Sequence, residues 1–284
     1  QVRPEFSVQV TCPRENARAA CHPLASIPLD FTAPLMRADA EKLRLVGPKG
    51  QEWAPELLGY PEGGEAEAEA ETVDRVEFKG PFPAEAEFRL KLPTQLRDDA
   101  GRPLANRERL AAVVLKTADY PPLLKFSADF GIVEFKTGGL LPVTLRNLDV
   151  LAADGLPGLK TPDGTPPGTA ARLRVRRVTR DEDVIALFGR LSDYADGKPE
   201  ARAQSVLQGD EDAKIWLLPK PHGPKPMEVV GIPLGEPGYY VVEAESARLG
   251  RSLLETGAPM FVHSAALNTN LAVHFKQGAE NQLV

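Results

Sequence analysis

Residues 27–31 read Ile27-Pro28-Leu29-Asp30-Phe31, so three apolar side chains alternate with two other residues. Side chains of an extended strand point alternately to its two faces, and this spacing predicts a strand with one buried face. The same alternation returns at Phe88, Leu90 and Leu92, where charged residues stand between the apolar ones. Turn-forming sequences such as Pro48-Lys49-Gly50 separate these stretches. We therefore expect the first half of the chain to be an antiparallel β-sandwich of immunoglobulin-like size.

The composition favours strands over helices. The 284 residues include 27 prolines and 24 glycines, and proline is excluded from helix interiors and from central strand positions. Hydrophobic residues make up 42% of the chain, which is enough to form a core. The formal net charge of -6 argues against nucleic acid as a partner, because a phosphate backbone attracts basic surfaces. The longest apolar run, residues 110–115, is far shorter than the ~20 residues of a membrane helix.

The second half continues in the same style but contains one helix. Five further stretches have strand character: residues 141–145, 173–175, 215–218, 239–244 and 260–262. Between the second and third of these stretches, residues 180–194 place Val184, Leu187, Phe188 and Leu191 at i, i+3, i+4 and i+7. This spacing predicts a helix that packs on a sheet through these four side chains. The predicted fold class is all-β, with tandem antiparallel β-sandwiches and one inserted helix near 180–194.

A proline pair indicates where the two sandwiches divide. The apolar run 110–115 is expected to be the last, doubly buried strand of the first sandwich. Tyr120-Pro121-Pro122 would follow it as a stiff linker, because consecutive prolines hold a chain extended. We therefore expect one domain at 1–119 and a second at 120–267.

The end of the chain has a separate pattern. Leu271, Val273 and Phe275 alternate with other residues, which predicts that 268–284 is the first strand of a following domain. The sequence also starts at Gln1 without an initiator Met. We expect it to be part of a longer protein.

The two cysteines, Cys12 and Cys21, lie nine positions apart. Their spacing matches neither a C-x-x-C redox motif nor a zinc knuckle, so a metal or redox pair is the alternative and not the first expectation. We expect a structural disulfide in an oxidising compartment. It would close a loop of about ten residues and stabilise the fold by ~2.7 kcal/mol through loop entropy.

The motifs of catalysis and metal binding are missing from the sequence. The four histidines are His22, His222, His263 and His274, and no two of them have the helical spacing of a metal pair. There is no G-x-S-x-G nucleophile elbow and no glycine-rich phosphate loop. We expect no metal, no cofactor and no enzymatic activity.

Three charged segments have ordinary structural explanations. Residues 98–101 lack the alternating carboxylates of a calcium loop and are expected to form a β-turn. Arg172, Arg174 and Arg176 share one strand face and could bind an anion, but we expect an exposed face paired with acidic neighbours. The acidic repeat at 65–71 has no apolar anchors and is expected to be solvated.

Several longer stretches resemble domains of known type. Ile27-Pro28-Leu29-Asp30-Phe31-Thr32-Ala33-Pro34-Leu35 resembles the opening of a bacterial immunoglobulin-like domain, and residues 92–104 resemble a later segment of it. Three other stretches resemble the N-terminal region of bacterial alpha-2-macroglobulins: residues 141–147, 237–243 and 269–276. The resemblance implies an immunoglobulin-like first sandwich and a macroglobulin-like second sandwich.

This family resemblance also implies a function. Its members are large periplasmic protease traps, and this chain is similar to a non-catalytic N-terminal spacer and docking region of such an inhibitor. The implied partners are target proteases, which other parts of the protein would contact, and a penicillin-binding protein. Attachment to the inner membrane through an N-terminal lipid is implied as well. Cys12 precedes Pro13-Arg14-Glu15 and Cys21 precedes His22-Pro23-Leu24, so neither matches the family's Cys-Gly-Glu-Gln thioester.

Two other classes of function stay open, because a fold does not fix a function. The chain could be a cell-surface adhesion or carbohydrate-binding immunoglobulin-like module, or an accessory domain of a secreted enzyme. A Cys-Gly-Glu-Gln motif beyond Val284, after further β-domains, would distinguish the protease trap from both. Residues 154–168 form a long, proline-rich segment with Lys160 as its only basic residue. We expect it to be an exposed loop and a poor substrate for most proteases.

Overall fold

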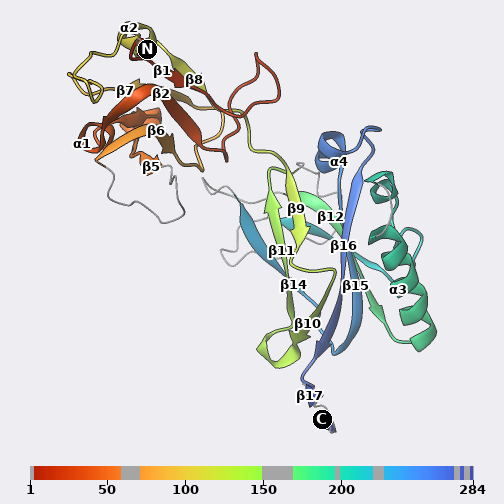
Figure 1. The fold of residues 1–284 in the computed structure, drawn as a ribbon. Helices are drawn as coiled ribbons and strands as arrows, with labels where there is room; N and C mark the ends of the chain where they lie inside the picture. Colours follow the sequence, from red (N-terminus) through yellow and green to blue (C-terminus); the bar gives the residue numbers. More distant parts are fainter. Residues whose placement is uncertain are drawn as a thin grey trace. The chain divides into compact units, whose positions relative to one another are not determined.

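The computed structural model of the protein describes residues 3–58, 71–148, 169–195, 199–219, 227–271, 276–277 and 282–283. The chain divides into two compact units, Gln1–Tyr120 and Pro121–Val284 (Figure 1). Each unit has its own sheets and its own apolar core. The expected boundary lay between residues 119 and 120.

The strands of Gln1–Tyr120 form two four-stranded antiparallel sheets. The first sheet has the order β1-β2-β6-β5: β1 (Val8–Val10), β2 (Ile27–Met36), β6 (Thr72–Phe78) and β5 (Glu56–Leu58). The second has the order β4-β3-β7-β8: β4 (Glu52–Trp53), β3 (Arg44–Val46), β7 (Glu87–Lys91) and β8 (Val114–Lys116). Three short helical turns lie between the strands: α1 (Arg37–Ala40), η1 (Pro48–Gly50) and α2 (Arg107–Ala111).

The core of this unit comes from the predicted alternation. Ile27, Leu29 and Phe31 are buried along β2, while the residues between them are partly exposed. The rings of Trp53 from β4, Phe88 from β7 and Phe82, which precedes β7, meet with centroids 5.3–5.8 Å apart. Fully burying each such side chain stabilises the fold by about 1.5–3 kcal/mol.

A glycine makes the close packing of these rings possible. A Cβ atom added to Gly47 would lie 2.7 Å from both Phe88 and Trp53. Real Cβ atoms do not approach carbon so closely, and any other residue at position 47 would therefore push the two rings apart.

The prediction for residues 110–115 is wrong. Leu110 and Ala111 end helix α2, and only Val114 and Leu115 of the run enter strand β8. Strand β8 lies at the edge of its sheet and its side chains are only partly buried, so it is not doubly buried. A short apolar run does not by itself distinguish a buried strand from a helical turn that leads into a strand.

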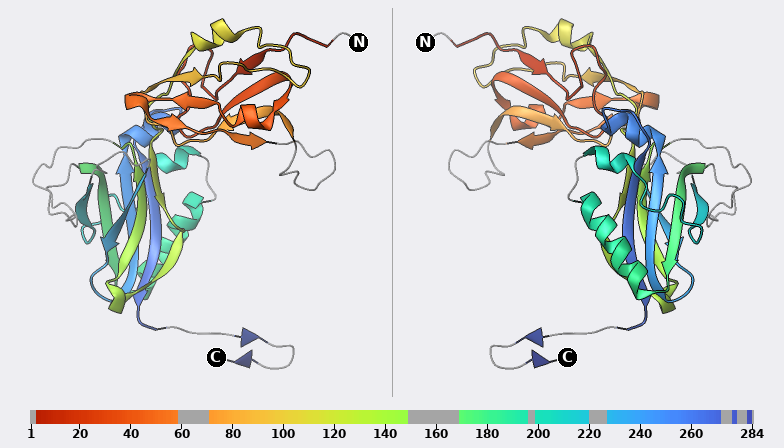
Figure 2. Two further views of the ribbon diagram at one scale, coloured as in Figure 1. Left: turned by 90° about the vertical axis from the view of Figure 1, so that its left-hand side faces the viewer. Right: turned by 90° about the vertical axis from the view of Figure 1, so that its right-hand side faces the viewer.

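The strands between Leu123 and Thr269 form a five-stranded and a three-stranded sheet (Figure 2). The larger has the order β10-β16-β15-β12-β13: β10 (Phe130–Glu134), β16 (Met260–Thr269), β15 (Gly238–Ser246), β12 (Thr169–Val178) and β13 (Lys214–Pro219). The smaller has the order β14-β11-β9: β14 (Glu228–Pro233), β11 (Leu140–Arg146) and β9 (Leu123–Phe126). One pairing departs from the predicted antiparallel arrangement, because β10 runs parallel to β16.

The predicted helix is present as α3 (Asp181–Ala195). Its Leu187 is buried, and Val184 and Leu191 pack beside it against Val178 and Val241 of the larger sheet. Phe188 does not follow the predicted stripe and is 64% exposed. It lies at the border of the buried stripe, where a small rotation of the helix decides between core and solvent. The remaining helical turns of the unit are η2 (Phe135–Thr137), η3 (Pro199–Ala203) and α4 (Ala247–Leu253).

Several predicted features fall outside the described residues. These are the acidic repeat at 65–70, the loop 154–168, His222, and residues 272–275 with Val273, His274 and Phe275. Strand β16 extends to Thr269, which is past the expected boundary at 267, and β17 (Lys276–Gln277) pairs with β18 (Gln282–Leu283). The separate domain at 268–284 stays a prediction. No helix in the described ranges is long and apolar enough to cross a membrane.

Candidate functional site

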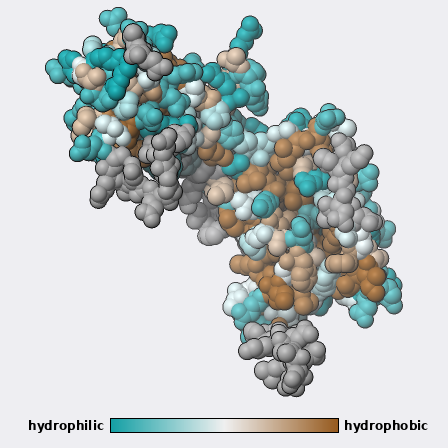
Figure 3. All heavy atoms as spheres, viewed as in Figure 1, coloured by the Kyte–Doolittle hydropathy of each residue, from teal (hydrophilic) through white to brown (hydrophobic). Residues whose placement is uncertain are grey.

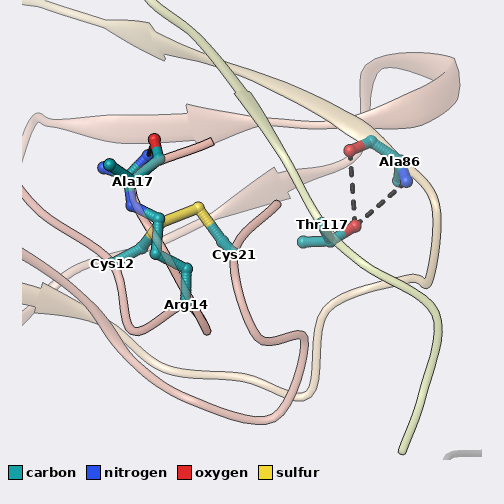
Figure 4. The surroundings of a disulfide bond; sticks show 6 residues. All are labelled: Cys12, Arg14, Ala17, Cys21, Ala86 and Thr117. Atoms are coloured by element: carbon teal, nitrogen blue, oxygen red, sulfur yellow. Dashed lines mark hydrogen bonds between the residues drawn. A yellow bond between two sulfur atoms is a disulfide. The ribbon is translucent and has the colours of Figure 1, made fainter. Parts of the chain in front are cut away.

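The two cysteines form a disulfide. Cys12 and Cys21 are joined with their Cα atoms 5.5 Å apart, within the usual range, and both are buried (Figure 4). Neither sulfur is therefore free to bind a metal or to act as a thiol nucleophile. The metal or redox alternative is not what the structure forms.

The backbone around Cys21 ties the disulfide loop to the end of the first unit. The Cys21 N–H donates to the Lys116 carbonyl at 2.7 Å, and the Ala118 N–H donates to the Cys21 carbonyl at 2.8 Å. Beside it, the buried Thr117 hydroxyl accepts from the Ala86 N–H (Figure 4). The same hydroxyl donates to the Pro83 carbonyl. The disulfide closes the loop 12–21, and the hydrogen bonds of Cys21 fasten this loop to the end of β8 and the segment that follows it.

The turn at 98–101 is closed by the buried carboxylate of Asp98. Gly101 donates its N–H to the Asp98 carbonyl at 3.0 Å. The Asp98 side chain accepts hydrogen bonds from the N–H groups of Ala100 and Arg102 and from the Arg102 guanidinium. Burial raises the pKa of Asp98, but these hydrogen bonds outweigh it and leave the pKa below its usual value.

The arginine strand is paired with carboxylates, as predicted, but only Arg172 of its three arginines has a well-exposed side chain, at 41%. Arg172 and Arg174 lie 3.6 and 3.1 Å from Glu245, and Arg174 lies 3.3 Å from Glu243. Only about an eighth of the side-chain surface of Arg174 and of Arg176 is exposed, at 14% and 13%. Helix α3 and the segment after it cover the strand face that the sequence predicted to be open.

Arg176 makes the remaining ion pairs of this face. It lies 2.7 Å from Asp212, 3.4 Å from Asp210 and 3.6 Å from Asp183 of α3. We call the whole group the arginine–carboxylate cluster: Arg172, Arg174, Arg176, Asp183, Asp210, Asp212, Glu243 and Glu245. Five carboxylates face three guanidinium groups in this cluster, so it has no positive excess with which to bind an anion.

Glu243 is the most buried member of the cluster. Its two oxygens accept hydrogen bonds from the Ser205 hydroxyl at 2.5 Å and the Val206 N–H at 2.6 Å. Burial raises the pKa of Glu243, and the hydrogen bonds and Arg174 oppose that rise. A general base for Ser205 would need a free lone pair directed at an attacking hydroxyl next to bound substrate. Glu243 instead anchors the segment at 205–206 to the sheet.

His263 lies beside this cluster and faces helix α3. Its buried ring contacts the ring of Tyr194, whose hydroxyl donates to the Phe261 carbonyl. Burial lowers the pKa of His263 to about 4, while nearby Asp129 raises it. The imidazole is therefore neutral at pH 7. The described residues include no group of three or more His, Cys, Asp or Glu side chains that could hold a metal ion.

Glu243 and His263 were not singled out from the sequence, although a signal exists. Glu243 is a charged residue that directly follows the apolar stretch Tyr240-Val241-Val242 and precedes Ala244. Such a charge needs a buried partner, and the alternating arginines of another strand supply it. The pairing itself depends on the register of β12 with β15, which the sequence does not specify.

A different feature of Pro121–Val284 lies on its surface. Large apolar side chains are exposed on β10 and α3, namely Phe130, Ile132, Ile185 and Phe188. We call these four residues the α3–β10 surface. Figure 3 shows apolar side chains gathered over α3, β10 and β14. Exposed apolar side chains gathered on one face are typical of binding surfaces.

The comparisons with known proteins find similarity to solved structures but none in sequence. No family model matches the chain, and no curated protein is similar to it in sequence. Among solved structures, the chain is similar to native alpha-2-macroglobulin from Escherichia coli, in a crystal structure spanning domains MG0-NIE-MG1. The two are 13% identical, with 96% of this chain and 75% of that chain covered and a TM-score of 0.47. A likeness at this TM-score transfers neither a fold nor the role of any residue.

Proposed function

We propose that the chain is a non-catalytic spacer and docking region of a periplasmic protease inhibitor of the alpha-2-macroglobulin type. One observation carries the docking role. Eleven large apolar side chains are exposed among the described residues, and ten of them belong to Pro121–Val284. Only Met36 belongs to Gln1–Tyr120. Surfaces of this kind are used for binding other molecules.

Gln1–Tyr120 has the properties of a spacer. Its aromatic core is closed, its disulfide constrains its N-terminal loop, and its charged strand residues pair with one another, as Lys91 does with Glu52 at 2.9 Å. A unit that satisfies its own side chains can hold its neighbours at a fixed separation without binding anything itself.

The proposed location and family rest on the disulfide and on the sequence. A disulfide is typical of oxidising compartments, which include the periplasm. The resemblance of residues 141–147 and 237–243 to alpha-2-macroglobulins supports the protease-trap family. Other parts of a longer protein would contact the proteases, and a penicillin-binding protein and an N-terminal lipid anchor belong to the same proposal.

Mixing the chain with trypsin or elastase tests the non-catalytic role. We expect no covalent protease–chain band on a denaturing gel, and the protease should stay fully sensitive to a large protein inhibitor. An alpha-2-macroglobulin that traps proteases is the positive control. A covalent band, or a protease shielded from the inhibitor, would show that the chain is itself a trap.

A further inference from the structure

Two of the exposed apolar residues lie on the edge strand of the larger sheet. Phe130 and Ile132 are 49% and 69% exposed and, as i and i+2 residues of β10, project from the same face. The ring of Phe130 stacks on that of Tyr239, with centroids 6.3 Å apart. Tyr239 in turn packs against the apolar cluster beneath α3, which contains Leu187. Phe130 and Ile132 are therefore on the face of the sheet that carries α3.

Helix α3 exposes a second pair next to its buried stripe. Ile185 and Phe188 are 73% and 64% exposed and, at i and i+3, lie on one side of the helix. Gly189 beside them has open space where a Cβ would be. The α3–β10 surface thus combines four large apolar side chains from two elements on the same side of the sheet.

The charges around these residues are mostly acidic and free. Asp129 and Glu134 flank the apolar pair of β10, and Asp181 and Glu182 begin α3. All four are exposed, and within the described part of the chain none forms an ion pair. Lys136 is the exposed base that follows β10. We call these four carboxylates the acidic rim, and their negative charge favours a positively charged partner.

We propose that the α3–β10 surface docks a protein segment with apolar side chains flanked by lysine or arginine. The apolar residues would cover Phe130, Ile132, Ile185 and Phe188, and the basic residues would pair with the four free carboxylates. A second copy of the chain fits less well, because it would bring the same acidic rim against itself. This inference rests on the docking half of the proposed function.

Binding of two designed peptides to the full chain tests the inference. One is a dye-labelled 15-residue peptide of leucine and lysine in an amphipathic order, and the other has glutamate in place of each lysine. Fluorescence anisotropy should show that the Lys/Leu peptide binds at least about tenfold more tightly than the Glu/Leu peptide. Its binding should weaken as salt rises, because salt screens the pairing at the rim.

Variants of exposed residues locate the site without threatening the fold. The double variant Ile132→Ser/Phe188→Ser should lose about tenfold or more of the Lys/Leu affinity, since it removes two apolar anchors. Leu253→Ser, an equally exposed apolar residue on α4, is the matched control and should leave binding unchanged. Asp129→Asn/Glu134→Gln should weaken the Lys/Leu peptide and abolish most of its salt dependence.

Three results would overturn the inference. The first is equal binding of the two peptides, and the second is an equal loss of Lys/Leu affinity in the double variant and in the Leu253→Ser control. The third is a dimer of the chain, seen by analytical ultracentrifugation, that the Ile132→Ser/Phe188→Ser variant dissociates. Mass spectrometry of the peptide after incubation keeps the two proposals apart. Cleaved peptide would contradict the non-catalytic function, whereas intact peptide with binding that ignores the surface variants would contradict the docking site alone.

Discussion

Gln1–Tyr120 and Pro121–Val284 are both built from two sheets around an apolar core, yet they expose different side chains. The first unit buries a cluster of aromatic rings and, among its described residues, exposes one large apolar side chain, that of Met36. The second covers an arginine–carboxylate cluster with α3 and exposes ten large apolar side chains in the part of it that the structure describes. Burying ion pairs while exposing apolar side chains does not favour the solubility of a unit. This difference is the basis of the proposal that the first unit is structural and that the second is the one that binds.

Each unit contains one tryptophan, which makes the comparison measurable. Trp53 lies in the first unit and Trp216 in the second. In a Trp216→Phe background the fluorescence reports on the first unit, and in a Trp53→Phe background it reports on the second. Each prediction below states which signal should change.

The largest expected effect is in the aromatic core of the first unit. Phe88 is fully buried between Trp53 and Phe82, so Phe88→Ala should lower the free energy of unfolding by about 3–5 kcal/mol. Phe130→Ala is the matched control, because the same truncation at a half-exposed ring should have a far smaller effect. Urea unfolding followed by Trp53 fluorescence measures the effect of Phe88→Ala, and unfolding followed by Trp216 fluorescence measures the effect of Phe130→Ala. Similar losses for both would remove the distinction between core and surface.

The second prediction concerns acid and the second unit only. Unfolded histidine titrates near 6.5, while burial holds the pKa of folded His263 at about 4. Between these values the unfolded state binds a proton that the folded state does not. The stability contributed by His263 is therefore lost as the pH falls from 6.5 to 4, by about 3 kcal/mol.

Urea unfolding at pH 7 and pH 4.5, followed at Trp216, tests the effect of His263. The variant His263→Gln should lose much less stability between these two pH values than the unmodified chain. Glu243 acts in the opposite direction, because its raised pKa removes stability as the pH rises. An identical pH dependence in the variant would show that His263 is not the group responsible.

The disulfide should stabilise the first unit by somewhat less. Replacing Cys12 and Cys21 by alanine should lower its free energy of unfolding by about 2.7 kcal/mol on the loop-entropy estimate, and leave the Trp216 transition unchanged. Thiol titration of the denatured, unreduced chain should find no free thiol. Two titratable thiols per chain would mean that the bond does not form.

The smallest expected effect is a gain in stability in α3. Gly189 lies inside this helix with nothing near its missing Cβ, so Gly189→Ala should raise the stability of the second unit by about 1 kcal/mol. Gly250 of α4 is the opposing control. An added Cβ there would lie 1.8 Å from the Ala258 carbonyl oxygen, and Gly250→Ala should destabilise the unit. The same sign for both variants would contradict the exposure of this side of α3.

Local sequence patterns predicted those elements whose burial is simple. Strand β2 follows the alternation of Ile27, Leu29 and Phe31, and α3 follows the spacing of Val184 and Leu187. The all-β class, which the prolines and glycines favoured, is confirmed by the strands and their mostly antiparallel sheets. Patterns of this kind depend only on neighbours along the chain.

The pairing of strands that are far apart in the chain could not be predicted from local sequence patterns. Arg174, Arg176 and Glu243 are buried because β12 pairs with β15 in one particular register. Their burial also requires the segment after α3 to fold back onto this face of the sheet. The exposure of Phe188 depends on how α3 is rotated on the sheet, and the parallel pairing of β10 with β16 depends on the topology of the whole unit. The proposed binding surface arises from these long-range features and could not be found from spacing alone.

The central claim is that binding belongs to one unit and to one face of it. Residue-resolved NMR of the full chain, titrated with the Lys/Leu peptide, tests it most directly. The account predicts that amide shifts gather at 129–136 and 181–192, with the signals of 3–58 and 71–120 unchanged. Shifts centred in Gln1–Tyr120, or spread evenly over the acidic residues of both units, would contradict it.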